Sequence, residues 1–432
     1  MAIDTGVRSQ LVEHVDKNLH LIAFEDSKEI TPHLALAEQR KIKDGFGRNF
    51  IVRFETNEGA AVAAQPDVAD EIAGDGSAGG RPERDRFVVS TVSLDSPFVF
   101  DRAEILAIEG KNASEQFDVI SSEMENSIKR IRNVLAEQVS GNGWGALAQI
   151  SAISSTTITV PDWAANRFRV GWRLVASNTE DTDVLYGTPA GAQLRVTAIA
   201  APSSGTVAIT LSGNPVTTWD NSTDFYVFRA GNRIATDPAA AESAKLCISG
   251  LKAHVDPDST TLWGVTRTGN PDLTGHDVNC ASAGDTHECL LEIAERAFIY
   301  GRKIDTILVS ARSWKLLNLD KDALKTVPVD KNGYTIGFKA FELPTSFGSV
   351  HVAPDAFMQP GYAWAGPFQD KEKGPRLYYA GKNLINIDDT DGQEFVRRAS
   401  TGSRDFAGQM YFSGQYVIPT PGLYFRGRNL PT

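Results

Sequence analysis

Positive charge, cysteine and long apolar runs are all scarce in this sequence, and each shortage excludes a class of protein. Of 432 residues, 43 are Lys or Arg and 54 are Asp or Glu, which gives a net charge of −11. A protein that binds nucleic acid tightly normally presents a basic face. We therefore expect any contact with DNA to be weak and independent of base sequence.

The cysteines and the apolar segments exclude secreted and membrane proteins. Cys247, Cys280 and Cys289 are too few and too unevenly spaced for a disulfide framework, which is typical of a reducing compartment. No apolar run approaches the ~20 residues that a membrane span needs. The opening stretch MAIDTGVRSQ lacks the basic-then-apolar order of a secretory signal. We expect a soluble chain made in the cytosol, with no membrane partner.

Catalytic and metal-binding motifs are also missing. The sequence contains no His-Glu-x-x-His, Gly-x-Ser-x-Gly or Cys-x-x-Cys. Cys280, His287 and Cys289 lie close together, but zinc takes four ligands and the sequence offers three, so ordinary packed or surface residues are the preferred interpretation. The segment 387–394 departs from a calcium loop and is interpreted as a solvated acidic turn. We predict no enzyme activity, no cofactor and no metal.

A long amphipathic helix is the clearest predicted element. Apolar residues recur at spacings of three and four over 113–139, which predicts a helix about 40 Å long. The apolar stripe consists of Phe117, Ile120, Met124, Ile128, Ile131, Leu135 and Val139. Three glycines follow this helix, whereas a phosphate-binding loop places its glycines before a helix. We therefore interpret Gly141 as a helix-ending glycine in the left-handed conformation.

Two further regions have distinct sequence patterns. Five or six short runs of alternating polarity between 153 and 232 predict an inserted β-barrel or sandwich. After it, Asp285 caps a predicted helix over 286–300, followed by a strand over 304–310, a short helix and a strand over 348–354. This order is an α/β pattern. The chain as a whole is predicted to be α+β.

An extended hairpin is predicted before the long helix. The strand-like runs 48–54 and 85–94 enclose a segment rich in Ala, Gly and Asp, and such a two-stranded extension is marginal alone. We expect it to lie on a neighbouring subunit. The candidate subunit-interface residues are Phe50, Arg53, Arg84 and Arg86. An equally good interpretation is that these four residues hold only their own hairpin.

Taken in this order, the elements resemble the major capsid proteins of tailed bacteriophages, which have the Hong Kong 97-type fold. The stretch LAEQVSGNGWGALAQI resembles the exit of the spine helix, and FRVGWRLV with the runs after it is similar to inserted β modules. ISGLKAHVD and LWGVTRTGNP resemble the connecting segments that follow. IDTILVSARSWKLL and GSVHVAPDAFMQPGYAWAG resemble the axial domain.

The resemblance implies a division of the chain into the domains of that family. They are an N-terminal arm (1–44), an extended loop (45–94), a peripheral domain with the spine helix (95–150), an inserted β domain (151–232), a connecting peripheral segment (233–280), an axial domain (281–366) and C-terminal strands that return to the peripheral domain (367–432).

The same resemblance implies a function and partners. Copies of the chain would form the hexamers and pentamers of an icosahedral virion shell around double-stranded DNA, assembled in the host cytoplasm. Implied partners are other copies, a portal protein, a separate scaffolding protein, a decoration protein and, without specificity, the packaged DNA. Some family members cross-link a lysine of the extended loop to a neighbour. Residues 44–110 contain no lysine, so we expect no such cross-link.

Two alternatives stay open from the sequence. One is an encapsulin-like cargo shell of the same fold, which would normally lack the β insert. The other is a carbohydrate-binding or adhesive β protein, in which Trp163, Trp172 and Trp219 would stack on sugars. Tryptophan in a small β module more often packs the core.

Overall fold

The fold is described by a computed structural model. It covers residues 32–43, 45–46, 49–57, 83–100, 113–180, 185–187, 191–219, 225–232, 235–237, 240–243, 246–268, 270–319, 341–345, 348–387, 396–397 and 406–431. The expected α+β class is confirmed, because three large sheets and one long helix make up the body of the molecule. The acidic segment 388–394 lies outside the described residues.

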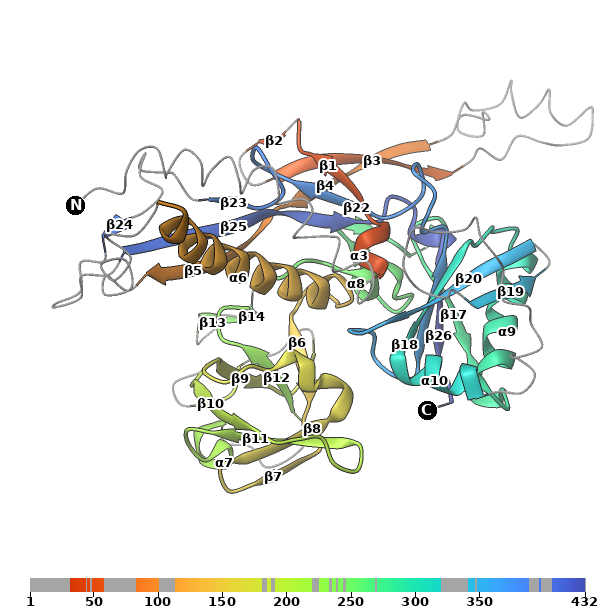
Figure 1. Ribbon diagram of the computed structural model, residues 1–432. Helices are drawn as coiled ribbons and strands as arrows, with labels where there is room; N and C mark the ends of the chain where they lie inside the picture. Colours follow the sequence, from red (N-terminus) through yellow and green to blue (C-terminus); the bar gives the residue numbers. More distant parts are fainter. Residues whose placement is uncertain are drawn as a thin grey trace, which may run out of the picture.

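The long helix lies along the first large sheet (Figure 1). Helix α6 spans Ala113–Val139, the predicted bounds, and packs on β5 and β25. The strands of this sheet are β1 (Glu38–Lys41), β22 (Arg376–Tyr379), β25 (Phe406–Val417), β23 (Asn386–Ile387), β24 (Val396–Arg397) and β5 (Val92–Phe100). The described part of the predicted stripe, from Met124 to Val139, is buried against it. The side chains of Phe117 and Ile120 are outside the described part.

The helix ends before the glycines, as predicted, but without the predicted left-handed residue at Gly141. The hydroxyl of Ser140 donates to Glu137 O at 2.8 Å, and Gly141 N donates to Gln138 O at 2.9 Å. These two bonds satisfy the carbonyls of Glu137 and Gln138 without a positive φ at Gly141. The left-handed positions are Gly143 (φ +87°) and Gly145 (φ +73°).

The inserted module is a seven-stranded antiparallel sheet below α6 (Figure 1). Its strands, in spatial order, are β6 (Ala146–Gln149), β12 (Tyr226–Arg229), β9 (Arg173–Ser177), β10 (Leu194–Ile199), β11 (Thr206–Leu211), β8 (Thr157–Pro161) and β7 (Ala152–Ser154). The prediction of a small β module is right, although it counted fewer strands. The sheet curls around its own core, in which Phe168, Trp219 and Phe225 are fully buried.

A second large sheet forms the α/β unit. Its strands, in spatial order, are β17 (His276–Asn279), β26 (Phe425–Arg428), β21 (Tyr362–Gly366), β18 (Thr306–Ser310), β20 (Gly348–Asp355) and β19 (Phe341–Thr345). Helices α9 (Thr286–Ile299) and α10 (Ala311–Leu319) pack on it. The predicted capping is present, because Asp285 accepts from Glu288 N at 2.7 Å. The two C-terminal strands belong to different sheets, because β25 lies in the first sheet and β26 in this one.

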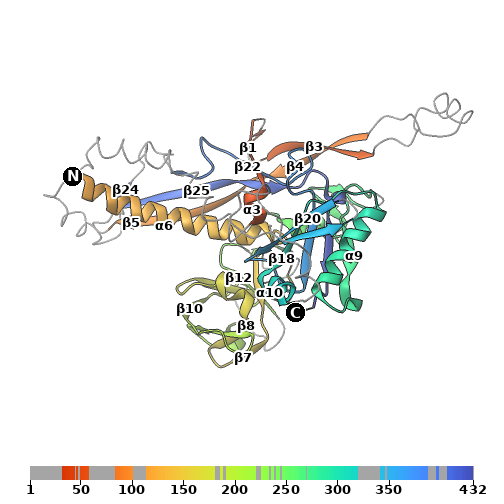
Figure 2. The ribbon, with the colours of Figure 1, turned by 45° about the vertical axis from the view of Figure 1, so that its right-hand side comes forward.

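The predicted hairpin projects beyond the body in both views (Figures 1 and 2). Strands β3 (Asn49–Asn57) and β4 (Glu83–Ser90) pair in antiparallel register, and β2 (Gly45–Phe46) adds a short third strand. Alternate residues of its base pack into the body. The hairpin is therefore anchored at one end and extended at the other.

Smaller elements connect these units. They are α3 (Pro32–Leu36), η1 (Asp162–Arg167), α7 (Pro215–Trp219), β13 (Ala235–Asp237), β14 (Ala240–Ser243), α8 (Leu251–Val255), β15 (Thr261–Leu262), β16 (Val265–Thr266), η2 (Cys280–Ser282) and η4 (Pro421–Leu423). No helix in the described part of the chain combines the length and apolarity needed to cross a membrane.

The cysteines depart from the expectation of ordinary packed residues. Cys280 of η2 and Cys289 of α9 form a disulfide, and both are buried. Three cysteines are too few for a framework, but the fold brings these two together across the start of α9. Cys247 remains a buried free thiol.

Candidate functional site: an exposed hairpin face and a buried junction

The four predicted interface residues have different surroundings in the structure. Phe50 is 3% exposed, and its ring centroid lies 4.9 Å from that of Tyr378, so its side chain packs within its own chain. Arg53 and Arg86 are exposed and are directly opposed Cα partners across β3 and β4. The backbone of Arg84 pairs with Glu55, and its side chain lies outside the described part.

The outward face of the hairpin combines like charge with apolar surface. Ile51 (37% exposed) and Val88 (42% exposed) are Cα partners, two positions along from Arg53 and Arg86 and on the same face. The face therefore presents two guanidiniums beside two aliphatic side chains, which suits a partner that carries carboxylates around an apolar centre. The sequence reasoning missed Ile51 and Val88, although the period of two places residues 51 and 53 on one face.

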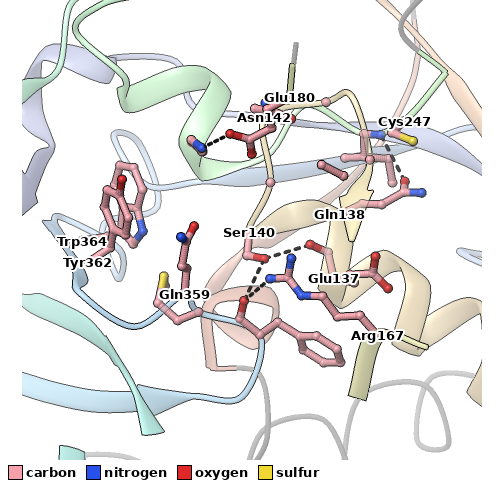
Figure 3. Close-up of a pocket in the computed structure, with 18 residues that line it drawn as sticks. Glu137, Gln138, Ser140, Asn142, Arg167, Glu180, Cys247, Gln359, Tyr362 and Trp364 are labelled. Atoms are coloured by element: carbon pink, nitrogen blue, oxygen red, sulfur yellow. Dashed lines mark hydrogen bonds and ion pairs between the residues drawn. The ribbon is translucent and has the colours of Figure 1, made fainter. Parts of the chain in front are cut away.

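A buried junction joins the insert to the rest of the chain (Figure 3). Arg167, at the end of η1, donates from Nη2 to Phe357 O at 2.5 Å, in the β20–β21 connection. Its Nη1 donates to Leu147 O in β6 at 3.2 Å. The guanidinium also lies 4.7 Å from the ring centroid of Trp163. One buried side chain therefore contacts the insert and the α/β unit together.

Glu137, in the last turn of α6, provides the counter-charge for this junction. Burial raises the pKa of its carboxyl, and the positive charges of Arg167, Arg229 and Arg169 partly offset that rise. Burial likewise lowers the pKa of Arg167, and Glu137 offsets part of the effect. Removing one partner of such a buried charge group leaves the other uncompensated, which is strongly destabilising.

Three further contacts close the same junction. Asn166 Nδ2 donates to Ala356 O at 3.3 Å, and Ser140 Oγ lies 3.4 Å from Phe357 O. Lys252 of α8 forms an ion pair with Glu180 of the insert at 2.5 Å. The insert is thus fixed to α6, to α8 and to the β20–β21 connection, which sets its direction relative to the body.

The tryptophans of the insert have structural partners. Trp219 is fully buried, and its Nε1 donates to Ala192 O at 2.8 Å. Trp163 lies under the guanidinium of Arg167, and Trp172 lies 4.1 Å from that of Arg229. Burial removes Trp219 from the adhesive alternative, and in Trp163 and Trp172 an arginine covers one ring face that a sugar would otherwise stack on.

Metal ligation has no support in the described residues. Among them, no group of three or more His, Cys, Asp or Glu side chains is arranged to hold an ion. Cys280 and Cys289 are joined to each other, and a disulfide sulfur is not the thiolate that zinc binds.

Comparison with known proteins gives matches at the level of structure only. No family model matches the chain, and no curated protein matches it. The cyanophage A-1(L) capsid matches at 10% identity and a TM-score of 0.47, covering 94% of each chain. A putative prophage capsid protein of E. coli CFT073 matches at 8% identity and 0.43, covering all of both chains. The SrpI encapsulin of Synechococcus elongatus PCC 7942 matches at 7% identity and 0.43, over 93% of this chain and 88% of that one.

Proposed function

We propose that this chain is a major capsid protein of a tailed bacteriophage. Its copies form hexamers and pentamers, which close into an icosahedral shell around double-stranded DNA in a particle assembled in the host cytoplasm. The observation that carries the proposal is the projecting hairpin, whose outward face bears Arg53, Arg86, Ile51 and Val88. A two-stranded extension is marginal alone, and a neighbouring copy would support it.

The buried junction supports the same function. A shell repeats one subunit many times, so a small change in subunit shape is multiplied over the whole particle. The contacts of Arg167 and the Lys252–Glu180 ion pair hold the insert in one orientation relative to the rest of the chain. A shell built from many identical copies requires such a fixed orientation. A heterologous contact between rigid copies closes into a ring when the rotation that relates one copy to the next is a full turn divided by a whole number.

The charge of the chain suits a container for DNA. The net charge of −11 limits the number of phosphates that the shell would neutralise, so packaged DNA would be held without tight binding. A portal protein, a separate scaffolding protein and a decoration protein are part of this proposal. The absence of lysine from 44–110 means that contacts rather than a covalent loop cross-link would reinforce the shell.

The test is assembly of the purified chain, followed by size-exclusion chromatography and negative-stain electron microscopy. We expect closed shells, or hexamers and pentamers, and nuclease-protected DNA in shells from infected cells. Arg53→Glu with Arg86→Glu should reduce assembly without unfolding the chain, because both side chains are exposed. A chain that stays monomeric with a crowding agent and with its co-expressed neighbouring genes would overturn the proposal. Shells that protect a cargo protein rather than DNA would also overturn it.

A further inference from the structure

Helix α9 presents an acidic and apolar stripe to solvent. Its opposite side packs into the core of the α/β unit. The outward residues recur at helical spacing, and together they are called the α9 acidic face: Glu288, Leu291, Glu292, Glu295 and Ile299. Leu291 is 38% exposed and Ile299 is 64% exposed. Three carboxylates therefore lie around Leu291, and the exposed Arg296 lies one helical turn after Glu292, near Ile299, so the face keeps a net negative charge.

The insert presents a surface of the opposite charge, here called the insert basic face: Arg169, Val170, Arg173 and Arg195. Val170 is 62% exposed. Arg173 of β9 and Arg195 of β10 are direct Cα partners. A Cβ placed on Gly171 would lie 3.6 Å from Arg195 Nη2, so this guanidinium lies against the turn that carries Val170.

The arginines of the insert basic face bond mainly to neutral groups. Arg169 Nη1 donates to Asn166 O at 3.0 Å and to Phe168 O at 2.9 Å. Arg173 Nη1 lies 3.5 Å from Gln193 Oε1. Among the described residues, no carboxylate forms an ion pair with Arg169, Arg173 or Arg195. Opposed like charges cost stability within the sheet, and an acidic partner would offset that cost.

The two faces lie on different flanks of the molecule. In both ribbon views α9 forms the flank of the α/β unit away from the insert, and β10 lies at the far side of the insert (Figures 1 and 2). Contact between the faces of one copy is therefore excluded, whereas contact between two copies is not. Each face offers what the other lacks, since one has carboxylates and the other guanidiniums, both around apolar side chains.

We infer that the α9 acidic face of one copy docks on the insert basic face of the next copy. This inference rests on the proposed capsid function and names one contact that holds the capsomer together. The contact is heterologous, so it propagates around a ring rather than pairing two copies. It also gives the insert a role, because the buried junction at Arg167 would set the angle at which the next copy binds.

The test reverses the charge of each face separately. One variant is Arg173→Glu with Arg195→Glu, and the other is Glu292→Lys with Glu295→Lys. Glu288 is left unchanged because its Oε2 accepts from Gly284 N at 2.6 Å at the helix start. Each variant should keep the circular dichroism of the parent and need at least about tenfold more protein to assemble, the equivalent of about 1.4 kcal/mol in contact free energy.

Mixing the two variants gives a sharper result. In a mixture, an unchanged α9 acidic face can meet an unchanged insert basic face, and the two reversed faces can also meet. Both contacts are satisfied only where the variants alternate around a ring. Native mass spectrometry should therefore show hexamers with three copies of each variant, and no pentamers, because an odd ring cannot alternate.

The matched control reverses two charges elsewhere. Arg312→Glu with Lys315→Glu, on the exposed side of α10, changes the net charge as the insert variant does and should assemble like the parent. If the parent assembles and either face variant assembles equally well, or if the mixture stays unassembled, the docking contact is wrong while the capsid function stands. If the parent itself never assembles, the proposed function fails.

Discussion

The side chains of His33 and Asp355 lie 322 positions apart in the sequence and meet in the core, where His33 Nδ1 faces Asp355 Oδ2. The other ring nitrogen, Nε2, lies 3.1 Å from Ala136 O. Both nitrogens thus face acceptors, so the pair is satisfied only when a proton lies between the imidazole and the carboxylate. Through this pair α3 is tied to α6 and to the end of β20.

The first prediction concerns this pair. His33→Ala and Asp355→Ala should each lower the free energy of unfolding by about 3 kcal/mol, because each leaves a buried polar partner uncompensated. The double variant should lose at least about 1 kcal/mol less than the sum of the two. Urea denaturation of the unassembled chain measures all four species. Additive losses would show that the two side chains do not interact.

The second prediction concerns the disulfide. Cys280 and Cys289 are 9 positions apart, and closing a loop of that size is worth about 3 kcal/mol in the chain-entropy model. Cys280→Ser should lower the melting temperature, and a reductant should lower that of the parent but not of the variant.

The remaining cysteine provides the control. Burial raises the pKa of the Cys247 thiol to about 12, and the nearby Glu137 adds to the rise, so this thiol should resist alkylation until the chain unfolds. Mass spectrometry after alkylation in denaturant should then find one modified cysteine without reductant and three with it. Three modified cysteines without reductant would mean that the disulfide does not form.

The local elements could be predicted because their patterns lie within a few turns of chain. The stripe ending at Val139 gave α6 its bounds, and Asp285 marked the start of α9. The alternation of residues 153–232 identified the insert as a β module. Within α6 and within each strand of the insert, the spacing of the apolar residues determines which side of the element is buried.

The candidate site was harder to predict because its contacts join distant segments. Nothing local shows that Arg167 would be buried or that Phe357 would supply its acceptor, since 190 positions separate them. The pairing of Cys280 with Cys289 likewise depends on where η2 lies against α9. Phe50 was predicted at an interface, and its burial follows from the packing of the hairpin base on Tyr378.

The third prediction follows from the lysine-free segment 44–110. Denaturing gels of mature particles should show a single band near 46.8 kDa, because the extended hairpin offers no amine for an isopeptide bond. The gel should be run with reductant, so that disulfide-linked species are not counted. A ladder of multimers that survives both reductant and boiling would contradict the prediction.

The fourth prediction is a pH dependence at His276. Burial lowers the pKa of this imidazole, Arg302 lowers it further, and Gly422 O and Asp272 oppose the change. The ring stacks on both Tyr300 and Phe425, at centroid distances of 4.6 and 4.8 Å. Below the ordinary pKa of 6.5 the unfolded state therefore binds more protons, and stability falls as pH falls.

His276→Phe keeps the stacking and removes the titration, so it isolates this effect. The unfolding free energy of the parent minus that of the variant should be smaller at about pH 5 than at about pH 7.5. All other titrating groups are present in both proteins, so their contributions cancel in this difference. Urea denaturation at the two pH values measures the difference. An advantage that stays constant or grows at the lower pH would contradict the assignment.

The fifth prediction tests the junction. Arg167→Met keeps much of the side-chain volume but removes the bonds to Phe357 O and Leu147 O, and it leaves Glu137 without its main counter-charge. We expect a loss of about 3 kcal/mol in unfolding free energy, because a buried charge is left unpaired. Hydrogen exchange should also rise in η1 and in the β20–β21 connection, while the strands at the centre of the insert stay protected.

Two further variants separate charge from packing at this junction. Arg173→Met removes an exposed guanidinium of the same module and should change stability by less than about 0.5 kcal/mol. Adding Glu137→Gln to Arg167→Met should recover part of the loss, because the uncompensated carboxylate is then gone. If the double variant is no more stable than Arg167→Met alone, Glu137 is not the counter-charge. The orientation of the insert would then depend on its hydrogen bonds to the β20–β21 connection and on the Lys252–Glu180 pair.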